Sequence, residues 1–142
     1  MIFFIFNKYK VEVFVECSGH DFKVLKKTLN ILITTLEEMS GKVYQMNLEY
    51  GNKKILTPDF KPEKIKISLE NINKLLGLNL NENQISKLLP KMEYEYKKNT
   101  VTVPSWRIDI LHEVDIAEDI AIAYGYDNFI PEVPNVATVG EE

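Results

Sequence analysis

Hydrophobic and polar residues alternate at period two along residues 11–16, and this alternation predicts a β-strand with one buried face. Over residues 22–39 apolar side chains recur every three or four positions, which predicts an amphipathic helix, and Gly41 is expected to cap its C-terminal end. A second alternating run, residues 44–50, predicts another strand that ends at a Gly-Asn turn pair. The first third of the chain is therefore predicted to be strand, helix, strand.

The hydrophobic pattern changes after the segment TPDFKPEK, whose two prolines and mixed charges predict a linker. The short alternating run KIKI predicts a strand, and Ser68 is expected to cap a helix that ends at Gly77. Asn81 and Gln84 have the spacing of a capping box for a second helix, which Pro90 interrupts. The two short helices predict a helix-turn-helix.

Two further alternating runs, EYEY and VTV, flank the basic sequence KKNT and predict a hairpin whose tip faces solvent. A last helix is expected to begin within residues 111–113, to bury Ile116, Ile120 and Ala123, and to end at Gly125. Strand, two helices, hairpin and helix together are typical of a winged helix.

The predicted elements divide the chain into two unequal parts of an α+β protein. Because a strand-helix-strand unit offers little sheet to cover its helix, residues 1–56 are interpreted as the end of a larger domain. Residues 57–62 are the predicted linker, residues 63–134 the winged-helix-like domain, and residues 135–142 a tail. The opening MIFFIFNKYK fits no element and indicates a start within a longer protein.

Composition narrows the classes of function. The chain is 45% hydrophobic and 27% charged, as in globular proteins, and its apolar runs are too short for a signal peptide or a membrane span. Cys17 is its only cysteine, so neither an internal disulfide nor a thiolate metal cluster is possible, and a reducing cytoplasm fits. Residues 104–142 carry nine acids against one arginine, which makes this end poorly suited to phosphate backbones.

Four carboxylates, Asp109, Asp115, Glu118 and Asp119, gather at the start of the last predicted helix. Three of them share one helical face, where like charges oppose each other by roughly 0.2–0.5 kcal/mol per pair unless a cation lies between them. Carboxylate oxygens are the ligands that Mg²⁺ prefers, although acids in a first turn also complement the helix dipole. His112 is either a general base or a capping residue.

Few residues other than these carboxylates suggest a functional site. Arg107, the only arginine, is expected to pair with a nearby carboxylate or with an acid of a partner, since its planar fork suits bidentate contacts. No nucleophile elbow, phosphate-binding loop or zinc-protease motif accompanies the acids. We therefore assign no catalytic residue and no cofactor-binding residue beyond the possible metal ligands.

The acidic run VPSWRIDILHEVDIAEDIAIAYGYDNF resembles the end of the B5 domain of the phenylalanyl-tRNA synthetase β subunit, of the archaeal and eukaryotic cytosolic type. The run SLENINKLLGLNLNENQISKLLPKMEYE is similar to the helix-turn-helix portion of that domain. The segment from VFVECSGH to TPDF resembles the close of the editing-type B3/B4 domain that precedes it. The resemblance covers almost the whole chain after residue 10.

The resemblance implies a magnesium ion held by the acidic positions and shared with the α subunit of an (αβ)₂ heterotetramer; the matching residues are Asp109, Asp115, Glu118 and Asp119. The implied enzyme is a cytoplasmic phenylalanine–tRNA ligase, which uses ATP to charge tRNA(Phe). Its β subunit contributes structure, RNA contacts and removal of mischarged tyrosine. The chain itself is expected to be a structural piece that does not catalyse alone and does not enter a membrane.

Two alternatives remain open from the residues. The first alternative is a free-standing nucleic-acid-binding winged helix, in which the KKNT tip would be the wing and the second helix would contact the bases. That helix carries Lys87 and Lys91 but no arginine. The second alternative is a small Mg²⁺-dependent phosphohydrolase that uses the same carboxylates.

Overall fold

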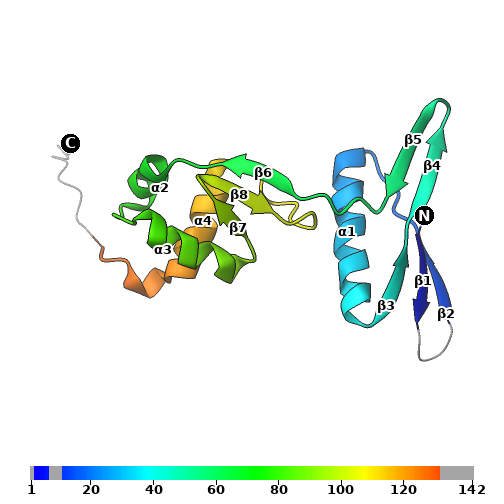
Figure 1. The fold of residues 1–142 in the computed structure, drawn as a ribbon, viewed down its shortest axis with the longest axis horizontal. Coiled ribbons are helices and arrows are strands. Elements are labelled where there is room, and N and C mark those ends of the chain that lie inside the picture. The colour runs from blue at the N-terminus through cyan, green and yellow to red at the C-terminus, as the bar shows by residue number, and fades with distance from the viewer. Residues whose placement is uncertain (1, 7–10, 132–142) are drawn as a thin grey trace, which may run out of the picture.

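The computed structural model describes residues 2–6 and 11–131, which form two units side by side along the long axis of the molecule (Figure 1). Both units combine helices with antiparallel sheets, so the fold class is α+β as predicted. In the described part of the chain no helix has the length and apolar character needed to cross a bilayer. The predicted tail, residues 135–142, lies outside the described residues.

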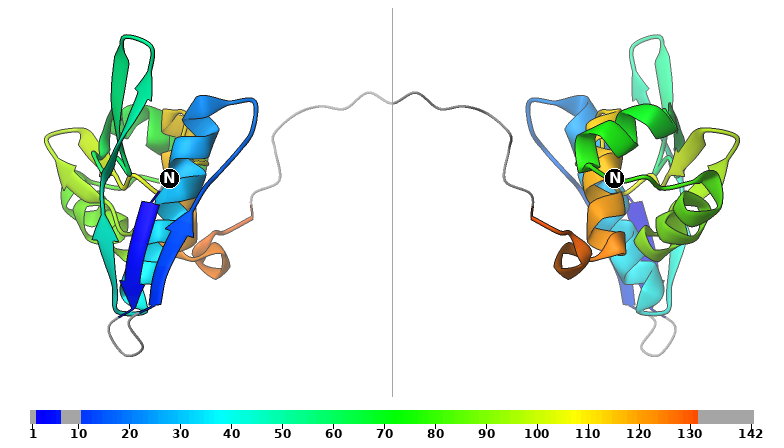
Figure 2. Two further views of the ribbon diagram at one scale, coloured as in Figure 1. Left: turned by 90° about the vertical axis from the view of Figure 1, so that its right-hand side faces the viewer. Right: turned by 90° about the vertical axis from the view of Figure 1, so that its left-hand side faces the viewer.

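The N-terminal unit is a helix on a three-stranded antiparallel sheet (Figure 2). Its elements are β1 (Ile2–Phe6), β2 (Val11–Val15), α1 (Phe22–Glu38) and β3 (Gly41–Tyr44). The strand order β2-β1-β3 places β1 in the centre of the sheet. The buried side of α1 carries Leu29 and Ile33, and the partly buried residues packed on this pair include Val13, Val15 and Val43.

Three features of this unit differ from the sequence prediction. The opening residues, assigned to no element, supply the central strand β1. The second alternating run is two strands, because the chain breaks at Gln45, whose side-chain amide donates to the Pro58 carbonyl at 2.9 Å. The second of these strands, β4 (Met46–Tyr50), pairs with an unpredicted β5 (Lys53–Thr57).

The end of α1 also differs from the prediction. Gly41 does not cap the helix but begins β3, while Ser40 adopts the positive φ of 71° and Met39 is the C-cap residue. A serine at positive φ is uncommon, which is why the sequence favoured the glycine one position later.

The C-terminal unit has the predicted order of strand, two helices, hairpin and helix. Its elements are β6 (Glu63–Lys66), α2 (Leu69–Leu76), α3 (Glu82–Leu88), a 3₁₀ turn (Leu89–Met92), β7 (Glu95–Lys97), β8 (Thr100–Val103), α4 (Glu113–Tyr124) and a short 3₁₀ turn (Tyr126–Asn128). The strands form one sheet in the order β6-β8-β7, and one core joins its inner face to all three helices.

The predicted helix boundaries in this unit are confirmed. The Ser68 hydroxyl accepts a hydrogen bond from the Asn71 backbone N–H at 3.3 Å, and Gly77 ends α2 at φ 67°. Asn81 and Gln84 exchange the two hydrogen bonds of a capping box, both 2.9 Å long. Local side-chain chemistry therefore determines where these helices begin and end.

The two units meet through buried polar groups of α1. The side-chain amide of Asn30 donates to the backbone carbonyls of Asp59 at 2.8 Å and Ser105 at 3.2 Å. The Lys27 ammonium donates to the Arg107 carbonyl at 3.1 Å and pairs with Glu63 at 3.3 Å. Helix α1 is thus buried on two sides, and it holds the loop that leads into α4.

Candidate functional site

The acidic cluster is built by the loop after β8 and by the first turns of α4. The loop folds back at residues 104–107, where the Arg107 N–H donates to the Pro104 carbonyl at 3.2 Å. Asp119 follows Ile116 by three residues in α4, so it shares the buried face of the helix and is only 6% exposed. A carboxylate at such a position needs a counter-charge and hydrogen-bond donors.

Arg107 supplies that charge. Its guanidinium donates to Asp109 through Nε at 2.9 Å and through Nη2 at 2.6 Å, and Nη2 also donates to Asp119 Oδ2 at 2.7 Å. The expected pairing of Arg107 with nearby carboxylates is therefore confirmed. The hydrogen bonds raise the pKa of Arg107 further above its ordinary value, and they lower the pKa of Asp109.

Tyr94 closes the cluster from the turn before β7. Its phenol donates a hydrogen bond to Asp119 Oδ2, and the Arg107 guanidinium lies 5.3 Å from the centroid of its ring. Burial, together with the hydrogen bond to Asp119, raises the pKa of the Tyr94 phenol. The sequence did not predict a role for Tyr94, although the inward positions of the EYEY alternation were an available signal.

Asp115 serves the start of α4. Its Oδ2 accepts hydrogen bonds from the backbone N–H groups of Leu111 and His112, each at 2.7 Å, which lowers the pKa of its carboxyl. The structure places His112 at the N-cap position of this helix. These backbone donors would otherwise have no partner within the helix, so Asp115 stabilises the first turn.

Glu113 and Glu118 act in different places. The Glu113 carboxylate accepts hydrogen bonds from the Ser68 N–H and from the Asn71 side chain, and so links the start of α4 to the start of α2. Glu118 is exposed and makes no ion pair or hydrogen bond through its side chain with any described residue. Glu113, whose role the sequence did not predict, is therefore structural, and Glu118 is available to a partner.

The predicted ligand set is not assembled in this arrangement. Asp109 and Asp119 meet at one guanidinium, while Asp115 caps the helix and Glu118 faces solvent. Among the described residues, no three His, Cys, Asp or Glu side chains are grouped to hold a metal ion. The donor chemistry still fits a hard cation, since every predicted ligand offers carboxylate oxygen. The metal set remains a prediction.

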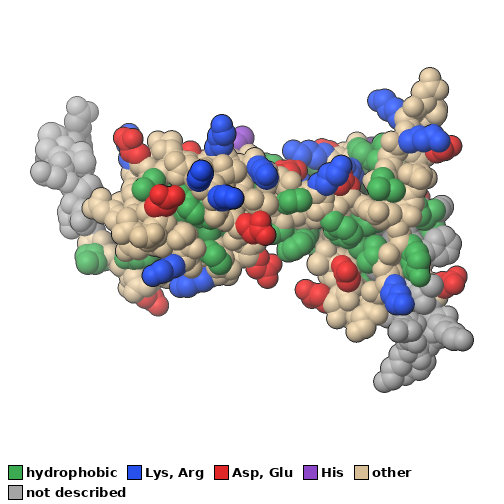
Figure 3. Space-filling view, in the orientation of Figure 1, with side chains coloured by type: hydrophobic (Ala, Val, Ile, Leu, Met, Phe, Trp, Pro, Cys, Tyr) green, Lys and Arg blue, Asp and Glu red, His purple; other side chains and the backbone are tan. Residues whose placement is uncertain are grey.

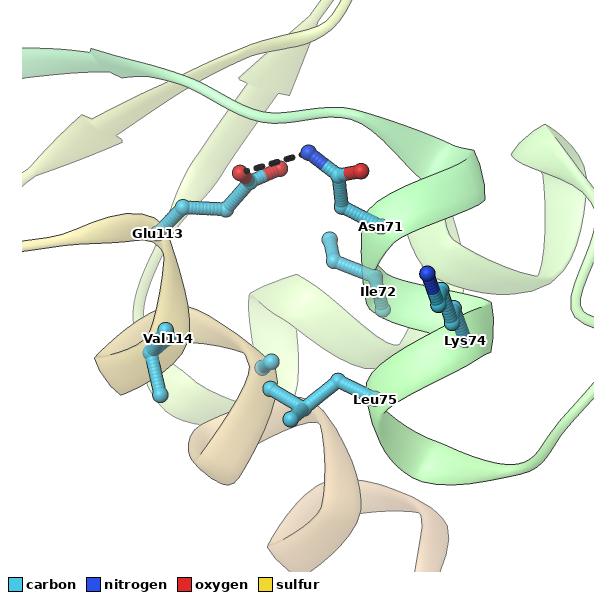
Figure 4. A pocket seen from close by; sticks show the side chains of 7 residues that line it. Asn71, Ile72, Lys74, Leu75, Glu113 and Val114 are labelled. Atoms are coloured by element: carbon cyan, nitrogen blue, oxygen red, sulfur yellow. Dashed lines mark hydrogen bonds between the residues drawn. The ribbon is translucent and has the colours of Figure 1, made fainter.

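An open groove lies between α2 and α4. Leu75 and Ile72 of α2 and Val114 of α4 line a cavity of about 450 Å³, with the Glu113–Asn71 hydrogen bond at its rim (Figure 4). Leu75 is 56% and Val114 58% exposed. Apolar side chains exposed together in this way are typical of interaction surfaces.

The lowered pKa values of Asp109 and Asp115 predict a loss of stability in acid. Their folded pKa values lie below the unfolded values, so the unfolded chain binds more protons and the stabilisation, complete near neutral pH, is lost as the pH falls below about 4. Urea unfolding of the parent and of Asp115→Asn between pH 7 and 3 checks this. The variant is expected to be less stable at pH 7 and to lose less between pH 7 and 3; equal losses would contradict the assignment.

The chain is similar to proteins of known family. Residues 65–126 match the model of the tRNA synthetase B5 domain. Over 133 residues the chain is 40% identical to the phenylalanine–tRNA ligase beta subunit of Pyrococcus furiosus, which covers 90% of this chain and 24% of the relative. The corresponding subunit of Methanococcus aeolicus is 37% identical over 134 residues, again 90% of this chain and 24% of the relative.

A solved structure agrees with these relatives. The fold is similar to that of an N-terminal fragment of the phenylalanyl-tRNA synthetase beta subunit from Pyrococcus horikoshii, with a TM-score of 0.70 and 38% sequence identity. The match covers 76% of this chain and 32% of that structure. The chain spans about a quarter of the length of the relatives it matches.

Proposed function

We propose that the chain is a structural segment of a phenylalanine–tRNA ligase, because residues 65–126 match the model of the tRNA synthetase B5 domain and about 90% of the chain aligns with beta subunits of that ligase. The whole ligase would charge tRNA(Phe) with phenylalanine, using ATP, in the cytoplasm. The segment carries no catalytic residue of its own and contacts the α subunit in an (αβ)₂ assembly. The similarity to these beta subunits supports the ligase family, and the exposed surface of α4 supports the contact with the α subunit.

The outer face of α4 supports the proposed subunit contact. Val114, Glu118 and Ile122 follow one another at four-residue spacing and are all exposed, so they form one stripe along the helix. Leu111, 62% exposed, extends the stripe into the preceding loop. Apolar side chains around one carboxylate suit a protein interface better than open solvent.

The predicted magnesium site includes Glu118 of this surface. We assign Asp109, Asp115, Glu118 and Asp119 as the residues that would hold Mg²⁺ at the contact. Glu118 has both carboxylate oxygens available, and Asp115 uses only Oδ2 for the backbone of α4. The ion would supply positive charge to carboxylates that otherwise oppose one another across the interface.

Glu118→Gln tests this function, because the Glu118 side chain makes no hydrogen bond or ion pair with any residue that the structure describes, so its loss should not unfold the chain. The variant is expected to bind the α subunit encoded in the same genome at least about tenfold more weakly than the parent in Mg²⁺, the lower end of what losing support at a metal site costs. Isothermal titration calorimetry with and without EDTA measures it.

Glu82→Gln is the matched control, since Glu82 is an exposed glutamate in the first turn of another helix, α3. The control is expected to bind the α subunit like the parent. Equal affinity of all three proteins, unaffected by EDTA, would remove both the ion and α4 from the contact.

A further inference from the structure

The sheet of the N-terminal unit has two chemically different faces. Helix α1 packs on one of them, against valines of β2 and β3. Because side chains alternate between the faces of a sheet, Glu12 and Phe14 of β2 and Lys42 and Tyr44 of β3 belong to the other face. We call these four residues the exposed sheet face. Figure 1 shows α1 between the sheet and the C-terminal unit, so the exposed sheet face lies at the end of the molecule.

Aromatic residues occupy one level of the exposed sheet face, where the solvated side of an antiparallel sheet is usually polar. Phe14 is 40% exposed and Tyr44 is 47% exposed. The register pairs both residues with Phe3 of the central strand β1. At this end of the molecule hydrophobic side chains reach the surface between acidic and basic ones (Figure 3). Apolar side chains exposed together are typical of an interaction surface.

Opposite charges lie on the two edge strands of the same face. The register pairs both Glu12 of β2 and Lys42 of β3 with Ile5 of β1, so the two charged residues share one level along the strands. They are two strands apart, about 9.6 Å. Both are exposed, and neither side chain forms an ion pair or hydrogen bond with any residue that the structure describes. The exposed sheet face therefore has an acidic edge and a basic edge.

We propose that the exposed sheet face binds the same face of a second copy of this chain, across a twofold axis that runs along β1 between the two sheets. This rotation places β2 of one copy over β3 of the other and keeps each level along the strands. Glu12 of each copy then faces Lys42 of the other, and Phe14 faces Tyr44. A twofold contact must be self-complementary, and this pattern of charges satisfies that condition.

The charges also distinguish this axis from the alternative. A twofold axis across the strands would place β2 over β2 and β3 over β3, so Glu12 and Lys42 would each lie on the side of a like charge. An unrelated partner would need an acid and a base at the same separation, whereas a second copy supplies them by symmetry. Sheets stacked about 10 Å apart, with their strands within about 30° of each other, are the usual geometry of a β-sandwich.

The contact is small, so the dimer is weak. Three strands of about five residues cover about 14 Å by 17 Å, well below the roughly 800 Å² that each partner buries in a standard interface. The dissociation constant is on the order of 100 µM. Salt weakens the dimer further, because ion pairs at the rim of a contact are screened.

This inference goes beyond the proposed function. It needs neither the α subunit nor a metal ion, and the exposed sheet face lies on the far side of α1 from α4 (Figure 1). Self-association of the chain and binding of the α subunit can therefore each fail without the other.

Charge reversal in the full 142-residue chain tests the contact. Sedimentation equilibrium between about 10 and 500 µM compares the parent with Glu12→Lys, with Lys42→Glu and with the double variant. Either single reversal places like charges opposite each other on both sides of the axis, so we expect dimerisation at least about tenfold weaker than in the parent. The double variant exchanges the two edges, restores the opposite charges, and is expected to dimerise like the parent.

A mixture of the two single variants tests the axis itself. Glu12→Lys has two basic edges and Lys42→Glu has two acidic edges, so opposite charges face each other only when one copy of each variant pairs. We expect the mixture to dimerise about as strongly as the parent, although neither variant does so alone. Glu82→Lys on α3 and Lys53→Glu on β5 are matched controls, since they make the same changes in net charge at exposed positions elsewhere.

The controls are expected to dimerise like the parent, separately and when mixed. A parent that stays monomeric at the highest concentration, single reversals that dimerise like the parent, or a mixture that gains nothing would each overturn the proposal. Thermal unfolding followed by circular dichroism checks that every variant is folded.

Discussion

Arg107→Met is expected to destabilise the C-terminal unit by about 3–5 kcal/mol, because it leaves the carboxylate of Asp119 buried without its cation. Asp119 is 6% exposed, and its remaining side-chain donor would be the Tyr94 phenol. Methionine keeps much of the volume of the aliphatic stem, so the loss measures charge and hydrogen bonding more than packing. Urea unfolding at pH 7, followed by circular dichroism, gives the free energy of unfolding.

Two controls separate the buried contact from the exposed one. Asp109→Asn removes the other carboxylate that pairs with Arg107. The Asp109 side chain is 59% exposed, so this change is expected to alter the free energy of unfolding by no more than about 1 kcal/mol. Arg107→Lys keeps the charge but not the planar fork, so its loss should fall between the two. A loss below about 1 kcal/mol for Arg107→Met would contradict the role of Arg107 as the internal cation.

Ile116→Ala is expected to lower the free energy of unfolding by about 2–5 kcal/mol. Ile116 is 0% exposed and packs in the core that joins α4 to the sheet, so alanine would leave a cavity that rigid neighbours on several elements cannot close. Chemical denaturation with urea measures the change.

Ile122→Ala is the matched control in the same helix. Ile122 is 46% exposed on the outer stripe, so the same truncation is expected to shift the free energy of unfolding by less than about 1 kcal/mol. If the proposed subunit contact is correct, Ile122→Ala should still weaken α-subunit binding. Similar unfolding losses for both alanine variants would show that α4 does not pack as described.

Some residues near the proposed contact also support the fold. Asp115 supports the first turn of α4 and Arg107 compensates a buried charge, so substitution of either changes the fold as well as the surface. The Glu118 side chain makes no hydrogen bond or ion pair with any residue that the structure describes. Its removal therefore reports on partners with little contribution from unfolding.

Short-range patterns were sufficient for most of the C-terminal unit. The Ser68 cap, the Asn81–Gln84 capping box and the Gly77 and Gly125 helix ends each depend on groups within about five residues of one another. The hairpin around KKNT follows from the same kind of local signal, with Lys98 and Asn99 at positive φ. Such elements can be predicted from sequence because their stabilising contacts are close in the chain.

The N-terminal unit was predicted less completely because its order depends on pairing between distant segments. Strand β1 lies between β2 and β3, and β5 is a strand through its pairing with β4. On α1, Lys27 and Asn30 are buried, which a hydrophobic pattern does not predict, since their partners Ser105 and Arg107 are more than 70 residues away. Contacts of this range override local preference.

Residue type and short spacing were enough to predict the α+β class, the ends of the C-terminal helices and the acidic run on which the resemblance to the ligase subunits depends. The folded chain was needed to show that Arg107 joins Asp109 to Asp119 and that Tyr94 completes this cluster. The reason is physical: a charge acts on whatever the fold brings within a few ångströms, and strand register and helix packing set that neighbourhood through contacts far apart in the chain.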